Sequence, residues 1–498
     1  MQDLKMKVYE SSPIFIQNIL ASLEGFNKSR KRFTDTYYQF LKELEERDYT
    51  NAEKEKQYQE QEMQKLIKHA AANSPFYQEF YKGIDIETIK TLEDLKKLPV
   101  LEKDLVRERI TSIYTIPEKG AMSSKTSGTS GTPIKFVFIK NDIQKRMAFL
   151  DFFKKQHGVV NLEMKRASFS SNPYISQTRQ KNVYWRDSYW NKQRLYSAFY
   201  CTPQTAGKYV ENLEKYKPDS IDGLPSSIYE VARYINENNI TLSFKPISIF
   251  PTAETLYPHY RMEIEKAFNC PVRNQYASSE GAPFITECPY GQLHYNLASG
   301  IIETGENGEM LVTGFHTYGT PLIRYKIGDW IDFPVNPKPC KCGSTHPVVE
   351  NIHGRNVDFL YSKNRGKITA LYLSMSTAKL PSVVKKMQFI QNSIDEINVL
   401  VEAGEGFTPE ITAGFHEDLK FFIGRDMKFN IQFVDEIPKQ ANSKFRLVIN
   451  NIEPNLLASL IVGEEWRISN ESVANESIRE VPNLFSEHLN EFGRLSKN

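Results

Sequence analysis

The spacing of apolar residues changes along the chain, and each change predicts a different kind of element. Up to about residue 85 the apolar side chains recur at helical spacing. Residues 33–49 and 52–72 each place aromatic or aliphatic side chains on one face, with charged residues on the other. The sequence therefore predicts a helical N-terminal region whose apolar faces pack in a core.

From residue 203 onward, helical patterns alternate with short β-rich runs. In chain order these patterns cover 206–215, 220–222, 227–237, 245–250, 256–268 and 272–276. Such alternation predicts a parallel sheet flanked by helices. Ligands of these sheets gather at the carboxyl ends of the strands, where Thr252 to Glu254 and Ala277 to Gly281 fall.

Two further regions have their own patterns. Shorter β-like runs at 300–304, 309–313, 322–325 and 330–333 follow the alternating region, and a smaller α/β segment begins near Gly354. Residues 305–308 read as a hairpin turn. Between residues 169 and 194 the chain reads as irregular. Its aromatic side chains either line a substrate pocket or pack in the core or on the surface, and they are Tyr184, Trp185, Tyr189 and Trp190.

Length and composition narrow the class of protein. The 498 residues, 40% hydrophobic and 25% charged, are typical of a globular protein of two or three domains. A net charge of +2 gives no support for a nucleic-acid partner or a membrane surface. No apolar run reaches the roughly 18 residues of a membrane span, and the N-terminus is unlike a signal peptide. We therefore expect a cytoplasmic protein, and the 5 scattered cysteines predict no disulfide scaffold.

A loop rich in Gly, Ser and Thr lies directly before the β-rich run 134–139. Its glycines let the backbone approach a ligand, and its hydroxyls and N–H groups suit phosphate oxygens. It lacks the Walker pattern, and the alternative is a polar linker. The candidate phosphate-binding residues are Thr126, Ser127, Gly128, Thr129, Ser130, Gly131 and Thr132.

Five spaced motifs together resemble those of the adenylate-forming superfamily over about residues 90–450. Residues 126–133 are similar to its TSGTTGxP signature, 276–281 to its Y-G-x-S/T-E segment, and 321–329 to its P-x-x-R-Y-x-x-G-D segment. Gly354-Arg355 resembles the hinge and Lys444 the terminal lysine. The phenylacetate–CoA ligase and CapK-like branch looks most similar.

This resemblance implies an α/β fold. A large N-terminal adenylation domain, with helix-flanked sheets and a β-rich subdomain, would be followed by a small mobile α/β C-terminal domain. We expect a helical region packed on the core at 1–85, the adenylation core at 86–354, a lid domain at 355–452 and an extension at 453–498.

The implied reaction is attack of a carboxylate on the α-phosphate of ATP, which gives an acyl-adenylate and pyrophosphate. The loop 126–132 would hold the β- and γ-phosphates. Mg²⁺ would neutralise them through hard oxygen ligands, with Glu280 as the candidate ligand and Thr129 assisting.

The remaining roles also follow from the resemblance. Tyr276 would stack on adenine, with Ala253 and Glu254 on the opposite wall, and Asp329 would bind both ribose hydroxyls. Arg355 would contact ribose or phosphate, and Lys444 would lie over the α-phosphate and the attacking carboxylate. The other nucleotide-binding candidates are Ala277, Ser278 and Ser279.

The chain departs from the family pattern near the hinge. Val357 replaces an acidic residue, residues 362–367 differ from the segment found in CoA ligases, and no glycine precedes Lys444. These departures leave the acceptor open among CoA, a carrier-protein thiol, an amine and a sugar hydroxyl. A transferase that moves AMP onto an alcohol and a nucleotide-binding module without catalysis are the alternative functions.

Four potential metal ligands lie apart from these motifs. They are Cys288, His294, Cys340 and Cys342. Three thiolates and one imidazole form the ligand set of a closed tetrahedral zinc site. The sequence therefore predicts a structural Zn²⁺ site, and the alternative is four unrelated side chains.

Overall fold

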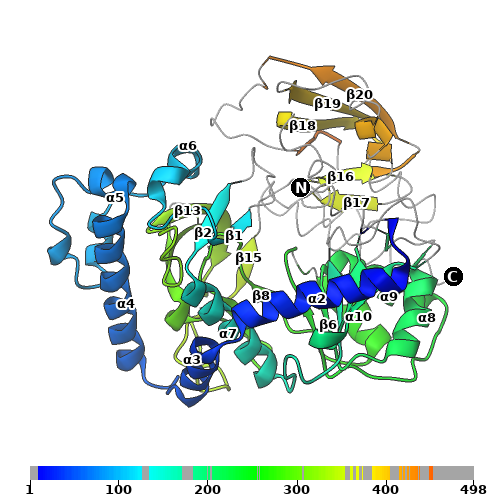
Figure 1. Ribbon diagram of the computed structural model, residues 1–498, viewed down its shortest axis with the longest axis horizontal. Helices are drawn as coiled ribbons and strands as arrows, with labels where there is room; N and C mark the ends of the chain where they lie inside the picture. Colours follow the sequence, from blue (N-terminus) through cyan, green and yellow to red (C-terminus); the bar gives the residue numbers. More distant parts are fainter. Residues whose placement is uncertain are drawn as a thin grey trace. The chain divides into compact units, whose positions relative to one another are not determined.

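The computed structural model divides into two compact units (Figure 1). Unit 1 comprises 1–124, 135–256 and 260–354, and unit 2 the remainder. The structure describes residues 9, 11–125, 134–170, 183–198, 200–201, 205–254, 256, 258–305, 308–353, 359–362, 366–369, 373, 384–403, 414–417, 419–420, 423–425, 427–435, 437 and 448–452.

The centre of unit 1 is a five-stranded sheet in the order β4-β5-β3-β6-β7. Its strands are β3 (Arg166–Ser170), β4 (Trp185–Ser188), β5 (Gln193–Ser197), β6 (Ser220–Gly223) and β7 (Ser248–Pro251). All neighbours are parallel except β4 and β5. Helix α8 (Ala206–Tyr216) connects β5 to β6 and α9 (Pro225–Glu237) connects β6 to β7, while α7 (Lys140–Gln156) precedes β3 and α10 (Pro258–Phe268) follows β7. The predicted parallel sheet is confirmed.

The irregular segment expected at 169–194 is wrong in part. Residues 185–188 form the edge strand β4, which pairs antiparallel with β5. The four aromatic side chains of this segment do not share a pocket. Tyr184 is buried and stacks on Tyr209 with ring centroids 5.5 Å apart, whereas Tyr189 and Trp190 are exposed on η3 (Tyr189–Asn191).

Two antiparallel sheets form the β-rich part of unit 1. One contains β8 (Gln275–Tyr276), β9 (Ile285–Glu287), β10 (Leu293–Tyr295) and β14 (Val348–Val349). The other contains β11 (Gly300–Thr304), β12 (Glu309–Gly314), β13 (Tyr325–Asp332) and β15 (Asn351–His353). The short helix η4 (Leu297–Ser299) lies between β10 and β11 in the chain.

These sheets correct two predictions. The strand expected at 272–276 joins the antiparallel sheet, and only Val272 bridges Ile249 of the parallel one. The strand expected at 322–325 begins only at its last residue, Tyr325. The turn at 305–308 is supported by the antiparallel pairing of β11 with β12.

Helices of the N-terminal part of the chain pack against this framework. They are α2 (Ile14–Arg32), α3 (Asp35–Glu46), α4 (Ala52–Asn73), α5 (Pro75–Phe80) and, after η1 (Ile86–Thr88) and η2 (Asp94–Lys97), α6 (Lys103–Ile113). On α3, Phe40 packs in a buried cluster with Phe149 and Phe284. Asn51 caps α4 by accepting a hydrogen bond from the Lys54 N–H at 3.0 Å.

A largely buried carboxylate joins α7 to two strands of the parallel sheet. Asp222 on β6 lies 2.9 Å from Lys154 Nζ and 3.3 Å from Arg166 Nε, and Ser168 donates a hydrogen bond to it. Burial raises the pKa of Asp222, but the two cations and the hydrogen bonds outweigh it, so the pKa lies below its usual value. Asp222 is therefore held as a carboxylate.

Unit 2 is built on the mixed sheet β20-β19-β18-β21 and a separate hairpin. The sheet strands are β18 (Val384–Ser393), β19 (Glu396–Ala403), β20 (Lys428–Phe433) and β21 (Val448–Asn450), and the hairpin is β16 (Phe359–Ser362) with β17 (Gly366–Thr369). A further pair of strands, β1 (Met122–Lys125) and β2 (Lys135–Phe138), lies in unit 1 except for Lys125 and flanks the loop 126–133 in the chain. Among the helices described, none is long and apolar enough to cross a membrane.

Replacing Lys154 with Met should destabilise the protein because it removes one cation from the buried carboxylate. Losing one partner of a buried ion pair costs several kcal/mol, and with Arg166 still present we expect about 3 kcal/mol. Lys155→Met is the matched control, because Lys155 pairs with Glu45 on the surface and should cost less than about 1 kcal/mol. Denaturant unfolding of both variants measures the difference. Equal free energies of unfolding for the Lys154→Met and Lys155→Met variants would contradict the buried ion pair between Lys154 and Asp222.

Candidate active site and metal centre

The carboxyl ends of β6 and β7 are tied together at one edge of the parallel sheet. The Thr252 N–H donates to the Gly223 carbonyl at 2.8 Å. Ala253 follows with a positive φ of 70°, a conformation that non-glycine residues rarely adopt. The next residue, Glu254, accepts a hydrogen bond from the Ser226 N–H at 3.1 Å. The turn after β7 is therefore strained and anchored on the start of α9.

The carboxyl group of Glu254 is poorly solvated. Its Oε1 is buried and has no hydrogen-bond partner among the described residues. Burial raises the pKa of Glu254, although the hydrogen bond from Ser226 acts against the rise. A buried acceptor without a partner is costly, so this oxygen is suited to receive a donor from a ligand.

Tyr276 and Asp329, which are 53 residues apart, meet beside this edge. The Tyr276 hydroxyl donates to Asp329 Oδ2 at 2.7 Å. Gln275, the residue before Tyr276, donates from Nε2 to the Pro251 carbonyl at the end of β7 at 3.3 Å. Asp329 follows Gly328, whose φ of +87° requires a glycine-like conformation within β13. Two predicted nucleotide-binding residues are thus brought together by the β8 and β13 strands.

The segment between Tyr276 and Glu280 is held by contacts along its backbone. The Ser278 carbonyl accepts from Arg146 Nη2 at 3.2 Å, and the Ser279 carbonyl accepts from Ser124 Oγ at 2.6 Å. At Gly281, φ is +99° and an added Cβ would lie 2.3 Å from Thr317 Cγ2. Ser124 precedes the loop 126–132 by two residues in the chain.

Glu280 is buried and lies near two cations. Lys103 Nζ is 3.8 Å from its Oε1 and also donates to the Ile327 carbonyl at 3.0 Å. Arg146 is the second cation; burial lowers its pKa to about 10, while the charges of Asp142 and Glu280 oppose that change. Sequence reasoning missed Lys103 and Arg146, because neither belongs to a motif near Glu280 in the chain.

Several predicted site residues lie outside the described part of the chain. These are Thr126, Ser127, Gly128, Thr129, Ser130, Gly131, Thr132, Arg355 and Lys444. Ala277 is placed, and its side chain packs at the margin of the cluster that contains Phe149 and Phe284. The described portion of the candidate active site therefore consists of the carboxylates Glu254, Glu280 and Asp329 with Tyr276.

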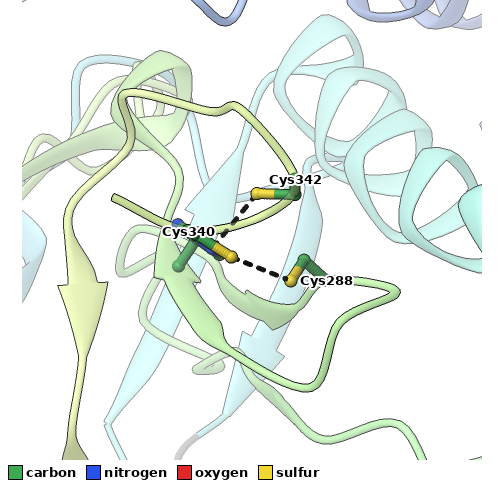
Figure 2. Close-up of side chains that lie close together, drawn as sticks. Cys288, Cys340 and Cys342 are labelled. Carbon is green, nitrogen blue, oxygen red and sulfur yellow. Dashed lines mark hydrogen bonds between the residues drawn. The ribbon is translucent and has the colours of Figure 1, made fainter. Parts of the chain in front are cut away.

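The four predicted metal ligands come together in unit 1, with the cysteines on two turns and His294 on β10, and Figure 2 shows the three cysteines. All four ligand atoms lie within 4.8 Å of one another. The Cys288 and Cys340 sulfurs are 3.7 Å apart, and Cys342 Sγ is 3.5 Å from His294 Nε2. Tetrahedral zinc with ordinary bond lengths requires about 3.8 Å between two sulfurs and about 3.6 Å between sulfur and nitrogen. The residues therefore fit Zn²⁺.

The surroundings of the cluster orient its imidazole. His294 Nδ1 is 2.9 Å from the His346 carbonyl, so a proton on Nδ1 donates to that oxygen and leaves the Nε2 lone pair directed at the sulfurs. Burial raises the pKa of Cys342 to about 11, and the neighbouring thiols add to the rise. A bound cation would reverse this effect and hold the sulfurs as thiolates.

Contacts beyond the cluster join it to the N-terminal helices. His346 Nε2 lies 3.1 Å from Glu55 Oε2, and Arg47 Nε donates to Glu55 Oε1 at 2.6 Å. The Thr345 N–H donates to the Tyr49 carbonyl at 2.8 Å. The cysteine turn is thus attached to α4 and to the connection between α3 and α4. The Tyr276–Asp329 pair takes no part in these contacts. This arrangement favours a structural role for the metal.

We expect the purified protein to contain about one zinc ion per chain by elemental analysis. Cys340→Ser should lose most of the zinc and unfold at lower temperature, because a structural site contributes binding free energy to folding. Cys201→Ala is the control, because Cys201 is a partly buried cysteine outside the cluster and its loss should leave the metal bound. Zinc-free wild-type protein that melts at the same temperature with and without added zinc would contradict the site.

Comparison with known proteins agrees with this architecture. Residues 360–451 match the family model of the CapK C-terminal domain. Protein CapK from Staphylococcus aureus is 38% identical over 452 residues, covering 90% of this chain and 99% of that protein. Phenylacetate-coenzyme A ligase from Escherichia coli (strain K12) is 23% identical over 299 residues, covering 54% of this chain and 65% of that enzyme.

Solved structures support the fold. A 2-hydroxyisobutyryl-CoA ligase, in complex with 2-HIB-AMP and CoA in the thioesterification state, superposes with a TM-score of 0.52 at 17% identity, covering 80% of this chain and 90% of that chain. The same enzyme in the postadenylation state gives a TM-score of 0.50 at 16% identity, with the same coverage. The predicted fold class, an adenylation domain followed by a smaller α/β domain, is confirmed. This chain belongs to the CapK family, and its fold is that of adenylate-forming CoA ligases.

Proposed function

We propose that this protein activates a carboxylic acid as an acyl-adenylate, with release of pyrophosphate, and passes the acyl group to an acceptor. The observation that carries the proposal is the pairing of Tyr276 with Asp329 at 2.7 Å, beside the carboxyl edge of the parallel sheet. This edge is where nucleotides bind in open α/β sheets. The family of the chain supports the same reaction.

The proposed adenosine site uses the described carboxylates. Asp329 would accept hydrogen bonds from the two ribose hydroxyls, because each carboxylate oxygen accepts more than one hydrogen bond. Tyr276, fixed by its hydroxyl, would present its ring to adenine. The strained turn at Ala253 and Glu254 would form the opposite wall, where the unpartnered Glu254 oxygen could accept from an exocyclic amine.

Glu280 is the proposed ligand of Mg²⁺. A buried carboxylate supplies the hard oxygen that Mg²⁺ prefers, and bound Mg²⁺ would neutralise the phosphates of ATP. Lys103, at 3.8 Å, would hold the carboxylate in place before the metal binds. By position in their motifs, Thr129 would assist the metal, and residues 126–132 would hold the phosphates.

The second domain would supply the remaining groups. Lys444 would stabilise the charge that develops between the acid and the α-phosphate, and Arg355 would contact ribose or phosphate. The second domain would rotate about residues 354–358 between the two half-reactions. The altered hinge favours an amine, a hydroxyl or a carrier thiol over CoA as acceptor. Resemblance to capsule-associated relatives supports a role in surface polysaccharide or secondary-metabolite assembly, in the cytoplasm.

Acid-dependent exchange of pyrophosphate into ATP tests the first half-reaction. Pools of aromatic, fatty, hydroxy and amino acids would be assayed with Mg²⁺. Lys444→Ala should lower the exchange by at least about a hundredfold, because removing one preorganised charge-stabilising group costs roughly 3 kcal/mol of barrier. Lys439→Ala, five residues earlier, is the matched control. ATP binding without exchange for any pool would favour AMP transfer to an alcohol or a non-catalytic module.

Asp329→Asn should raise the KM for ATP because the amide loses a charged acceptor for the ribose. Hydrogen bonds to charged groups contribute about 1.5–3 kcal/mol, so we expect a loss of roughly 10- to 150-fold in kcat/KM for ATP. The apparent KM for the acid should change little. The exposed Asp104→Asn is the control. An unchanged KM for ATP in Asp329→Asn would contradict the assigned ribose site.

A further inference from the structure

Helix α2 contacts the rest of unit 1 through its small and polar residues. The buried positions repeat every four residues at Gln17, Ala21, Gly25 and Ser29. Gln17 Oε1 accepts from Arg186 Nε on β4 at 2.6 Å, and Ser29 Oγ donates to Asn191 Oδ1 at 2.8 Å. This face is therefore specified by hydrogen bonds rather than by apolar packing.

Gly25 sets how closely the helix approaches the sheet edge. A Cβ at this position would lie 2.4 Å from Ser188 Oγ, at the end of β4. Asn18 Oδ1 also accepts from the Asp187 N–H at 3.1 Å. These contacts fix which face of α2 is turned away from the protein.

The opposite face of α2 is apolar and exposed. Phe15, Ile19 and Leu23 repeat every four residues and are 64%, 50% and 53% exposed, and Leu20 beside them is 38% exposed. In an ordinary surface helix the apolar stripe faces the core and the polar side faces water. On α2 the polar side faces the protein and the apolar stripe faces solvent. In Figure 1, α2 lies at the front of unit 1.

Two more exposed aromatic residues continue this surface. Tyr189 and Trp190 on η3 are 63% and 60% exposed. The Trp190 ring contacts Phe26 of α2 with centroids 4.5 Å apart, and helical spacing places Phe26 on the same side as Phe15 and Leu23. We call Phe15, Ile19, Leu20, Leu23, Tyr189 and Trp190 the apolar face.

The charge around the apolar face is positive. Residues 14–32 contain one acid, Glu24, which lies 3.2 Å from Lys28 Nζ. Arg30 and Lys31 are exposed in the last turn of α2, and Lys192 is exposed just after η3. A second copy of this helix would offer these cations a single acid, Glu24, which already pairs with Lys28. Anionic lipid headgroups would, and aromatic side chains beside an aliphatic stripe are typical of the bilayer interface.

We propose that the apolar face docks the protein on the surface of an anionic lipid bilayer. The aliphatic side chains would enter the headgroup and acyl boundary, and the basic end of α2 would contact the headgroups. The helix would lie on the bilayer and not cross it. This attachment is separate from the candidate active site, so it would bring the ligase to substrates or acceptors carried on lipid without changing the acid-activation step.

Sedimentation of the full chain with vesicles tests the proposal. We expect binding to vesicles of phosphatidylglycerol and phosphatidylcholine, and much weaker binding to phosphatidylcholine alone. Phe15→Ser/Ile19→Ser/Leu23→Ser should lower the partition coefficient at least tenfold, while Met262→Ser/Val335→Ser, which removes two exposed apolar side chains elsewhere, should leave it unchanged. Arg30→Gln/Lys31→Gln should reduce the preference for the anionic lipid. The melting temperature and pyrophosphate exchange of all variants should match wild type.

Three results would overturn this inference. Wild-type protein could stay in the supernatant with anionic vesicles at low salt. The triple serine variant could bind the vesicles as wild type does. The wild type could form a dimer by light scattering that the triple variant breaks, which would assign the apolar face to a second copy.

Discussion

The constraint on which the rest of unit 1 depends is the direction of the strands in its central sheet. Parallel strands place all their carboxyl ends at one edge, so the chain must cross back before each new strand, through α8 and α9 before β6 and β7. The bond from Thr252 to Gly223 joins two of these ends, and Gln275 is attached to the last residue of β7. Every described candidate for nucleotide binding lies on a segment attached to that edge or to the β-rich sheets beside it.

How far the sequence predicted the structure depended on the range of the interactions. The helix and strand alternation after residue 203 is a local pattern, and it predicted β6 and β7 correctly but assigned 272–276 to the wrong sheet. Strand β4 was missed because an edge strand is specified by its partner β5 and by α2, which the local sequence does not reveal. Residues 322–324 have the composition of a strand, but β13 begins only after them, at Tyr325.

The candidate site shows the same limit. Motif spacing selected Tyr276 and Asp329, and the structure brings them into contact. Motif spacing gave no sign of Lys103, which is far from Glu280 in the chain and belongs to no motif. The four metal ligands were selected by residue type alone, and they lie within 4.8 Å of one another. The roles of the loop 126–132, Arg355 and Lys444 stay predictions, because those residues lie outside the described part of the chain.

The attachment of the cysteine turn to the N-terminal helices has a consequence for biosynthesis. The Thr345 contact with Tyr49 spans 296 residues, and the Gln59 contact with Gly300 spans 241. At ribosomal rates, roughly 15 to 60 s separate the synthesis of the two ends of the longer contact. During this interval the segment between α3 and α4 lacks its partner. The nascent chain therefore exposes unfinished helical surface for most of its translation, when chaperones would bind it.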